Sequence, residues 1–308
     1  EVAAEAVRRG HDVVCANRGQ SGTVPPGARQ VHWDRSEPAP AAVLDGEYDA
    51  VLDVARHPSH VRTALDALAG AHWVFVSTIS VYADHADPGG PGVGRLLDPI
   101  TDDLDPFSSP VAYGAMKVAC EQLVQERAAS AAVVRPGLIV GPGDPSGRFA
   151  YWASRSDRSD EVLAPGDPAD AGQVLDVRDL AAWLVTLAEE RTVGLWDAVG
   201  ERLRMADLLA ATLPRAALVW VDEDFLAAEG VEPWAGTDGI PLWLPRPAYD
   251  GMTAHDPEPA LRAGLVLRPV ADTTSDTRVW LDGDPTARID GLTVERETEL
   301  LAKWKDRA

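Results

Sequence analysis

Tyr113 and Lys117 are the pair of residues whose types and spacing point most directly to chemistry. They stand four residues apart in a stretch that predicts a helix, so both side chains share one face, one turn apart. A phenol loses its proton at about pH 10, and a nearby ammonium favours the phenolate. The pair is therefore a candidate general acid and base. A solvated surface contact between the two side chains is the alternative that the spacing leaves open.

A second group of polar side chains follows the apolar run at 73–76, which predicts a buried strand. Ser77, Thr78, Ser80 and Tyr82 would lie at the carboxyl end of this strand. Open α/β sheets place their ligand crevice at such ends. The hydroxyls would hydrogen-bond a carbonyl or an alcohol there, although Ser and Thr can also simply end a strand.

The elements that would position these residues alternate between strands and helices. Near-continuous apolar strands alternating with helices indicate a parallel sheet covered on both faces, so we predict an α/β, doubly wound parallel sheet of the Rossmann type. From Leu203 the pattern changes to helices and loops rich in Pro and Trp, which predicts a smaller carboxyl-terminal region. The expected strands are 11–16, 30–33, 48–55, 73–77, 131–140, 173–177 and 194–199, and the expected helices are 1–9, 58–68, the Tyr113 helix and 179–190, capped by Asp176 or Asp179.

The charge balance restricts the class of partner. The chain has 308 residues, with 28 basic and 49 acidic side chains and a formal net charge of -21. Such a field repels nucleic acid and anionic membranes, so we expect neither as a partner. The two cysteines, Cys15 and Cys120, lie in apolar stretches and fit a reducing compartment. With no signal peptide and no long apolar run, a cytoplasmic location is the default expectation.

Taken in order, these motifs resemble the extended short-chain dehydrogenase/reductase superfamily, which contains NAD(P)-dependent epimerases, dehydratases and reductases. The resemblance covers most of the chain and is strongest from Asp12 to Gly200. It rests on Ser77-Thr-Ile-Ser-Val-Tyr82, Tyr113-Gly-Ala-Met-Lys117, Arg135-Pro-Gly-Leu-Ile-Val-Gly-Pro142 and Gln173-Val-Leu-Asp-Val-Arg-Asp-Leu180.

The resemblance assigns a role to each matching residue. Thr78 would hydrogen-bond the reacting oxygen, and Tyr113 would exchange a proton with that oxygen as hydride moves to or from the nicotinamide. Lys117 would lower the tyrosine pKa and hydrogen-bond the nicotinamide ribose. Pro136 and the backbone after it would face the carboxamide. The implied catalytic set is therefore Thr78, Tyr113 and Lys117.

Further positions are implied at the cofactor. After the second strand of this superfamily an acidic residue binds the ribose 2′-hydroxyl of NAD, whereas an arginine accommodates the 2′-phosphate of NADP. Asn17 and Arg18 hold this position here, which favours NADP and leaves NAD open; Arg18 could instead stack on adenine or be solvated. The other expected cofactor-binding residues are Asp34, Arg35, Ala55, Arg56 and Ser77.

One departure from the superfamily concerns the amino terminus. The Gly-rich turn G-x-x-G-x-x-G, which carries the pyrophosphate, and the strand before it are not found in the chain. The stretch 1–9 resembles the rest of the helix that follows this turn. We expect that the strand and the turn are missing from this sequence; a truncated, cofactor-deficient relative is the alternative.

A second departure concerns the reaction. In the related sugar-nucleotide dehydratases an acidic pair follows the catalytic threonine, but Ile79 and Ser80 stand there in this chain. An epimerase or a simple carbonyl reductase remains, acting on a small molecule such as a nucleotide sugar. A non-catalytic relative that binds a nucleotide or RNA is the alternative of another class. The candidate substrate-binding residues are Ser80, Tyr82, Arg148 and Trp152.

The remaining expectations concern domains, metals and assembly. We assign 1–147 and 172–200 to dinucleotide binding, and 148–171 and 201–308 to the substrate. His57 and His60 have the spacing of a ligand pair, but no third ligand is evident nearby in the sequence, so we expect no metal. Whether the chain forms a homodimer stays open.

Overall fold

A four-stranded parallel sheet forms the centre of the computed structural model, which describes residues 1–20 and 22–307. The strand order is β10 (Gly194–Ala198), β5 (Ser130–Pro136), β4 (His72–Val76) and β3 (Ala50–Asp53). Every neighbouring pair is parallel, with helical crossovers between the strands. The predicted α/β fold with a parallel sheet is confirmed.

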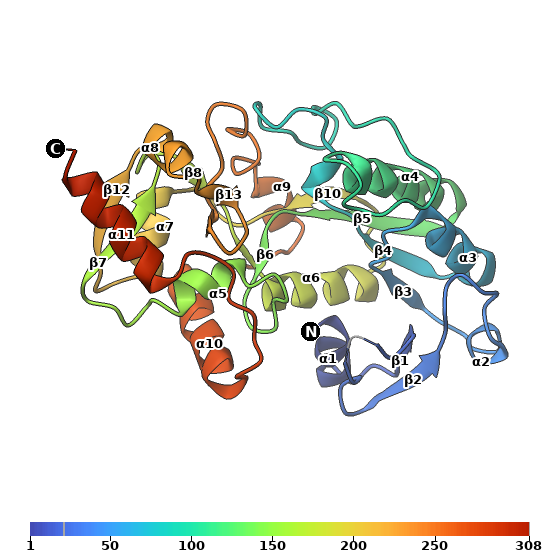
Figure 1. The fold of residues 1–308 in the computed structure, drawn as a ribbon. Helices are drawn as coiled ribbons and strands as arrows, with labels where there is room; N and C mark the ends of the chain where they lie inside the picture. The colour runs from blue at the N-terminus through green and yellow to red at the C-terminus, as the bar shows by residue number, and fades with distance from the viewer. Residues whose placement is uncertain (21, 308) are drawn as a thin grey trace.

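Helices cover both faces of this sheet, because its strands alternate two sets of apolar side chains. Trp73 and Phe75 of β4 pack against α3 (Pro58–Leu68) and α4 (Ala112–Arg127). Val74 points to the other face and packs against α6 (Val177–Glu189). Figure 1 shows α4 and α6 on opposite sides of the strands.

A separate parallel pair, β1 (Val13–Asn17) and β2 (Ala28–His32), lies beside the main sheet. In the part of the chain that the structure describes, β1 is hydrogen-bonded to β2 and not to β3, so the parallel strands form two groups and not one continuous sheet. Helix α1 (Val2–Arg8) packs beside this pair. Arg9, the residue after α1, donates to Ala182 O of α6 at 2.7 Å and so connects α1 to the helices of the main sheet.

The expected elements of the first two hundred residues are present, with ends that differ by a few residues. The segment at 131–140 divides into β5 and β6 (Ile139–Val140). Asp176 caps α6 by accepting from Arg178 N at 2.8 Å, which decides between the two caps that the sequence offered. The shorter elements of this half are α2 (Ala41–Leu44), the 3-10 turn η1 (Ile79–Val81) and β9 (Leu175–Asp176).

The carboxyl-terminal region has its own apolar core and contains more strands than the sequence predicted. The segment 148–170 contains a helix and a strand, because Phe149, Trp152 and Leu163 are buried in this core. The elements are α5 (Arg148–Ala153), β7 (Glu161–Pro165), β8 (Ala171–Gly172), β11 (Leu203–Arg204), α7 (Met205–Thr212), β12 (Ala217–Val221), α8 (Glu223–Ala228), β13 (Glu232–Trp234), β14 (Gly239–Pro241), α9 (Glu258–Arg262), α10 (Val270–Gly283) and α11 (Val294–Lys305).

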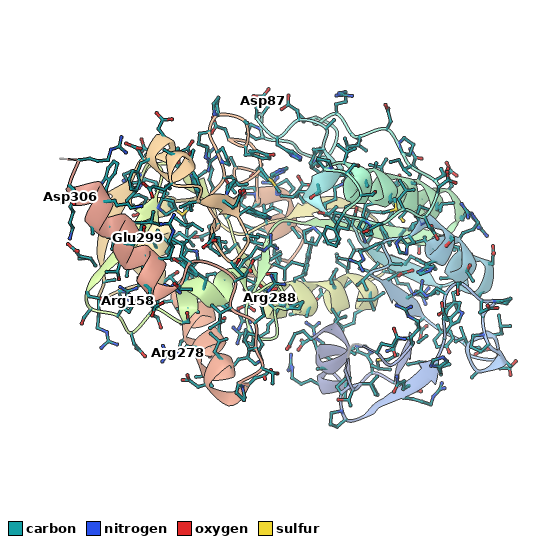
Figure 2. The ribbon with its side chains drawn as sticks, in the orientation of Figure 1. Asp87, Arg158, Arg278, Arg288, Glu299 and Asp306 are labelled. Carbon is teal, nitrogen blue, oxygen red and sulfur yellow. The ribbon has the colours of Figure 1, made fainter. Side chains whose placement is uncertain are left out.

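Helices α10 and α11 lie at the end of the molecule opposite α2 and α3 (Figure 1). Charged side chains gather around them: Figure 2 labels Arg158, Arg278 and Glu299 there, and Arg278 pairs with Asp157 at 3.1 Å. Leu300 of α11 is buried, so one face of this helix belongs to the core although its other face is charged. Among the described helices, none combines the length and the apolar character that a membrane crossing requires.

Candidate active site

Thr78 stands where the chain leaves the carboxyl end of β4 and turns into η1. Its hydroxyl oxygen accepts from Ser80 N at 3.1 Å, which caps this short turn, and its hydroxyl donates to Ser80 Oγ at 3.2 Å. Thr78 is buried, whereas Ser80 is half-buried. The turn therefore presents two linked hydroxyls at the edge of the sheet where the ligand crevice was predicted.

Tyr113 lies in the first turn of α4 and faces the Thr78 turn. Burial raises the pKa of Tyr113 above its ordinary value and outweighs the nearby Thr78 hydroxyl and the charge of Arg56, both of which favour the phenolate. Gly114 permits the close approach, because a Cβ at this position would lie only 2.0 Å from Ser80 O. The glycine after the tyrosine thus lets the helix pack directly on the turn.

Lys117 lies one turn further along α4 and is almost completely buried. Its ammonium donates to Val76 O at 2.6 Å and to Ala55 O at 2.8 Å, with Val54 O at 3.4 Å, and it lies 4.7 Å from the ring centroid of Phe75. Burial lowers the pKa of Lys117 to about 8.

The predicted effect of Lys117 on Tyr113 is not present in this arrangement. The ammonium is turned toward the carbonyl groups that end β3 and β4, and the pKa of Tyr113 is raised by burial. The spacing of four residues is correct and both side chains lie on one face. The difference arises because three backbone acceptors compete for the ammonium, which sequence spacing cannot reveal.

The residues predicted at the adenine end of a cofactor lie at the ends of β1 and β2. Asn17 and Arg18 are exposed, and Arg18 Nη1 is 4.0 Å from Asp34 Oδ2. Arg35 differs from its predicted role, because its guanidinium donates to the buried Asp53 at 2.8 Å and to His60 O at 3.2 Å. Arg35 therefore connects β2 to β3 and α3 instead of facing an open site.

Of the remaining residues predicted to bind the cofactor, three lie near the predicted crevice and one does not. Ala55 O holds Lys117, Arg56 is exposed, and Pro136 ends β5 beside Ala198 of β10, so all three lie near the predicted crevice. Ser77 does not, because its hydroxyl donates to the buried carboxylate of Glu121.

For two of the four residues predicted to bind the substrate the prediction is wrong, because their side chains are buried in the protein. Tyr82 is 2% exposed and its hydroxyl donates to Asp197 at 2.8 Å. Trp152 is fully buried and donates to Pro241 O at 2.9 Å. Both are core residues. Ser80 keeps its place at the turn, and the guanidinium of Arg148 lies 4.6 Å from the ring centroid of Trp234.

A buried polar network behind the turn was missed by sequence reasoning. Arg135 donates to Glu121 and, at 2.9 Å, to the hydroxyl of Tyr82; Asp197 accepts from Tyr82 and lies 2.8 Å from His255 Nδ1. It connects α4, β5 and β10 to the carboxyl-terminal region behind Thr78. Only the position of Glu121, four residues after Lys117, hinted at this network, because Asp197 and His255 carry no local signal.

A third potential metal ligand was also missed. Asp103 lies beside His57 and His60, and one ligand atom of each lies within 4.8 Å of the others. The argument against a metal rested on the lack of a third ligand near this pair in the sequence. Asp103 precedes α4 and is far from both histidines along the chain, so the lack of a third ligand in the neighbouring sequence does not exclude a metal.

The described surface has hollows of about 400 and 490 Å³ that are not lined by Thr78 or Tyr113. The larger one lies between α4, the 91–96 segment and strands β5 and β10, and its lining includes Gln122, Gln125 and Arg135. The candidate reactive groups lie elsewhere, at the carboxyl end of β4 and in the first turns of α4.

Comparisons with known proteins identify the family and the fold of the chain. The profile of the NAD dependent epimerase/dehydratase family matches residues 14–195. No curated protein matches the chain.

Solved structures share the fold at low sequence identity. UDP-glucuronic acid 4-epimerase from Bacillus cereus, in complex with NAD, has a TM-score of 0.62 at 13% identity, covering 92% of this chain and 94% of that one. MoeE5 in complex with UDP-glucuronic acid and NAD has a TM-score of 0.60 at 18% identity, with the same coverage. The Bordetella bronchiseptica enzyme WbmH in complex with NAD+ has a TM-score of 0.58 at 17% identity, covering 91% of this chain and 93% of that one. The family profile covers more than half of the chain, which therefore belongs to the NAD dependent epimerase/dehydratase family, enzymes of the extended short-chain dehydrogenase/reductase type.

Proposed function

We propose that this protein is an epimerase or reductase that moves hydride between a nicotinamide cofactor and a carbonyl or alcohol group of a small substrate. The observation that carries the proposal is the packing of the first turn of α4, which holds Tyr113, directly on the Thr78–Ser80 turn at the carboxyl end of β4, with Lys117 one helical turn away. These three groups supply a hydroxyl, a phenol and an ammonium within one crevice.

The residues present fit the two ends of a dinucleotide. Carbonyl groups from the ends of β3 and β4 converge on Lys117, which lies at the edge of the sheet where open α/β sheets bind their ligands. We assign Thr78, Tyr113, Lys117 and Pro136 to the nicotinamide end, and Asn17 and Arg18 to the adenine end. When bound, the nicotinamide supplies the hydride chemistry.

Each side chain then has a defined task. The hydroxyl of Thr78 holds the reacting oxygen, and Tyr113 donates a proton to it or removes one. Because burial raises the pKa of Tyr113, the free protein holds the phenol protonated and is prepared to donate. Lys117 must turn from its backbone acceptors toward the ribose before it can favour the phenolate.

The proposed substrate class is a nucleotide sugar. MoeE5 was solved with UDP-glucuronic acid and with UDP-glucose, at 18% identity to this chain in both complexes. Ser80 and Arg148 are the substrate residues that we retain, since a hydroxyl and a guanidinium suit a sugar and a phosphate. We propose 1–147 and 172–200 as the cofactor region, and 148–171 and 201–308 as the substrate region.

The test is cofactor binding followed by turnover. NADH and NADPH are titrated while nicotinamide fluorescence is recorded; UDP-glucose and UDP-glucuronic acid are then incubated with the protein and bound cofactor, and the sugar is analysed by proton NMR. Inversion at a single carbon supports an epimerase. Failure to bind either nucleotide would refute the enzyme proposal, and binding without turnover of any carbonyl or sugar substrate would favour the non-catalytic alternative.

Two finer proposals accompany this function. A homodimer is proposed as the assembly and is tested by light scattering at several protein concentrations. A cytoplasmic location is proposed from the two cysteines without a disulfide between them, since Cys15 and Cys120 are free in the structure; fractionation of cells tests it.

A further inference from the structure

His57, His60 and Asp103 form a compact group beside the proposed active site. His57 is the residue before α3, and His60 lies in its first turn, with the two rings edge to face and their centroids 5.1 Å apart. Asp103 comes from the segment before α4. One ligand atom from each residue lies within 4.8 Å of the other two, and both imidazoles are half-buried.

Ser59 holds the carboxylate in place. Asp103 Oδ1 accepts from Ser59 N at 3.1 Å, and Oδ2 accepts from the Ser59 hydroxyl. These bonds cap the amino terminus of α3, which has no side-chain cap of its own. Capping explains the position of Asp103, but it does not explain why two imidazoles from the same turn meet that carboxylate.

We propose that His57, His60 and Asp103 bind one divalent transition-metal ion, with Zn²⁺ as the best match. Two imidazole nitrogens and a carboxylate oxygen are a common zinc donor set, and they leave a fourth position for water. Mg²⁺ and Ca²⁺ prefer oxygen ligands, so the imidazoles disfavour them. This proposal is independent of the proposed function, because it uses none of Thr78, Tyr113 or Lys117.

The geometry requires a small closing movement. Ligand atoms around a tetrahedral zinc ion at about 2.0 Å are roughly 3.3 Å apart, whereas the three atoms here lie within 4.8 Å of one another, so they must approach by at most about 1.5 Å. Rotation of the two half-buried imidazole rings toward the carboxylate that Ser59 holds can supply this movement.

The local field makes the carboxylate essential. The positive end of the α3 dipole opposes a cation, and two neutral imidazoles do not compensate for it. Asp103 supplies the negative charge, and it is needed all the more because the charge of Arg35 acts on His60 against a cation and the charge of Asp34 only partly offsets it. Loss of the carboxylate should therefore weaken metal binding more than the loss of one ligand out of three would by itself.

A bound ion would connect two segments that border the active site. His57 follows Arg56, whose neighbour Ala55 accepts from Lys117, and Asp103 lies in the segment that leads to Tyr113. The metal would therefore clamp α3 to this segment. It would limit the relative movement of these two segments at the border of the crevice, without contacting the reacting atoms.

The experiment measures metal binding by the full chain. After EDTA treatment and removal of the chelator, the protein is titrated with Co²⁺ by visible absorption and with Zn²⁺ by calorimetry. We expect one ion per chain and the intense visible band of tetrahedral Co²⁺. His60→Gln and Asp103→Asn should each weaken Zn²⁺ binding at least about tenfold, because even outer-shell changes cost that much.

Matched variants complete the test. Asp102→Asn removes the adjacent acid, and His32→Gln removes an exposed histidine of β2; both should bind Zn²⁺ like the parent. Circular dichroism confirms that each variant is folded, and His60→Gln decides the question if Asp103→Asn unfolds. No saturable binding would overturn the proposal, as would an unchanged affinity in His60→Gln or an equal loss in the two control variants.

Discussion

The ammonium of Lys117 donates to the carbonyl of Val76 at 2.6 Å, which fixes α4 to the carboxyl end of β4. The same ammonium donates to Ala55 O, so one side chain joins a helix to two parallel strands. A residue predicted from its chemistry thus also organises the crevice.

The stability contributed by Lys117 should depend on pH. Its pKa is lowered to about 8 in the folded protein, whereas an unfolded lysine titrates at about 10.4. Between these values the unfolded chain binds more protons, so the stability of the parent relative to Lys117→Met should rise as the pH increases from about 8 to about 10. Below about pH 8 lysine is charged in both states and the difference should level off. Urea unfolding of both proteins across this range checks the slope, and a difference that falls with pH would contradict the lowered pKa.

Tyr113→Phe should abolish most of the turnover while leaving cofactor affinity nearly intact. The substitution removes only the proton donor, and general acid–base catalysis contributes about 10²–10⁴-fold. Steady-state kinetics and NADH titration measure the two effects. Turnover equal to that of the parent would remove Tyr113 from the mechanism.

Thr78→Val should lower kcat by about 10–10³-fold, because it removes the hydroxyl that orients the reacting oxygen while keeping the side-chain volume. Thr78→Ser restores the hydroxyl and should recover most of the rate. The pair separates chemistry from packing: if valine and serine reduce kcat equally, the shape of the turn matters and the hydroxyl does not.

Arg18 and Asp34 should act in opposite directions on cofactor choice. Arg18→Ala removes the cation available to a 2′-phosphate and should weaken NADPH binding about tenfold with little effect on NADH. Asp34→Asn removes the carboxylate 4.0 Å from that cation and should strengthen NADPH binding. Fluorescence titrations with both nucleotides give the ratio of the NADPH and NADH affinities. If this ratio is the same in the parent protein and in both variants, Arg18 does not recognise the 2′-phosphate.

Breaking the buried pair of Glu121 and Arg135 should be strongly destabilising. Arg135 donates from Nε at 2.9 Å and from Nη2 at 2.6 Å to the carboxylate, and both side chains are buried. Removing one partner leaves an uncompensated charge, so Glu121→Leu or Arg135→Met should cost about 3–5 kcal/mol, and the double variant should cost less than the sum.

The exposed pair of Arg204 and Asp207 serves as the control for this prediction. Arg204→Ala should change the free energy of unfolding by less than about 1 kcal/mol, because solvent screens surface ion pairs. Additive costs in the double variant of the buried pair, measured by urea unfolding, would show that the two groups are not coupled.

The sequence by itself determined the features that depend on neighbouring residues. Alternating apolar strands and helices predicted the parallel sheet, because burial on both faces requires apolar side chains throughout each strand. The spacing of Tyr113 and Lys117 predicted a shared helix face, since helix geometry places residues four apart one above the other. Asp176 was available as a cap for the same local reason.

Only the tertiary structure decided which distant groups meet. Tyr82 and Trp152 resembled ligand-binding residues in the sequence, but packing buries both and pairs Tyr82 with Asp197. The direction of the Lys117 ammonium depends on carbonyl groups from two other strands. Asp103 meets His57 and His60 because a loop and a helix end pack together. Such partners are chosen by packing and burial, and separation along the chain carries no record of that choice.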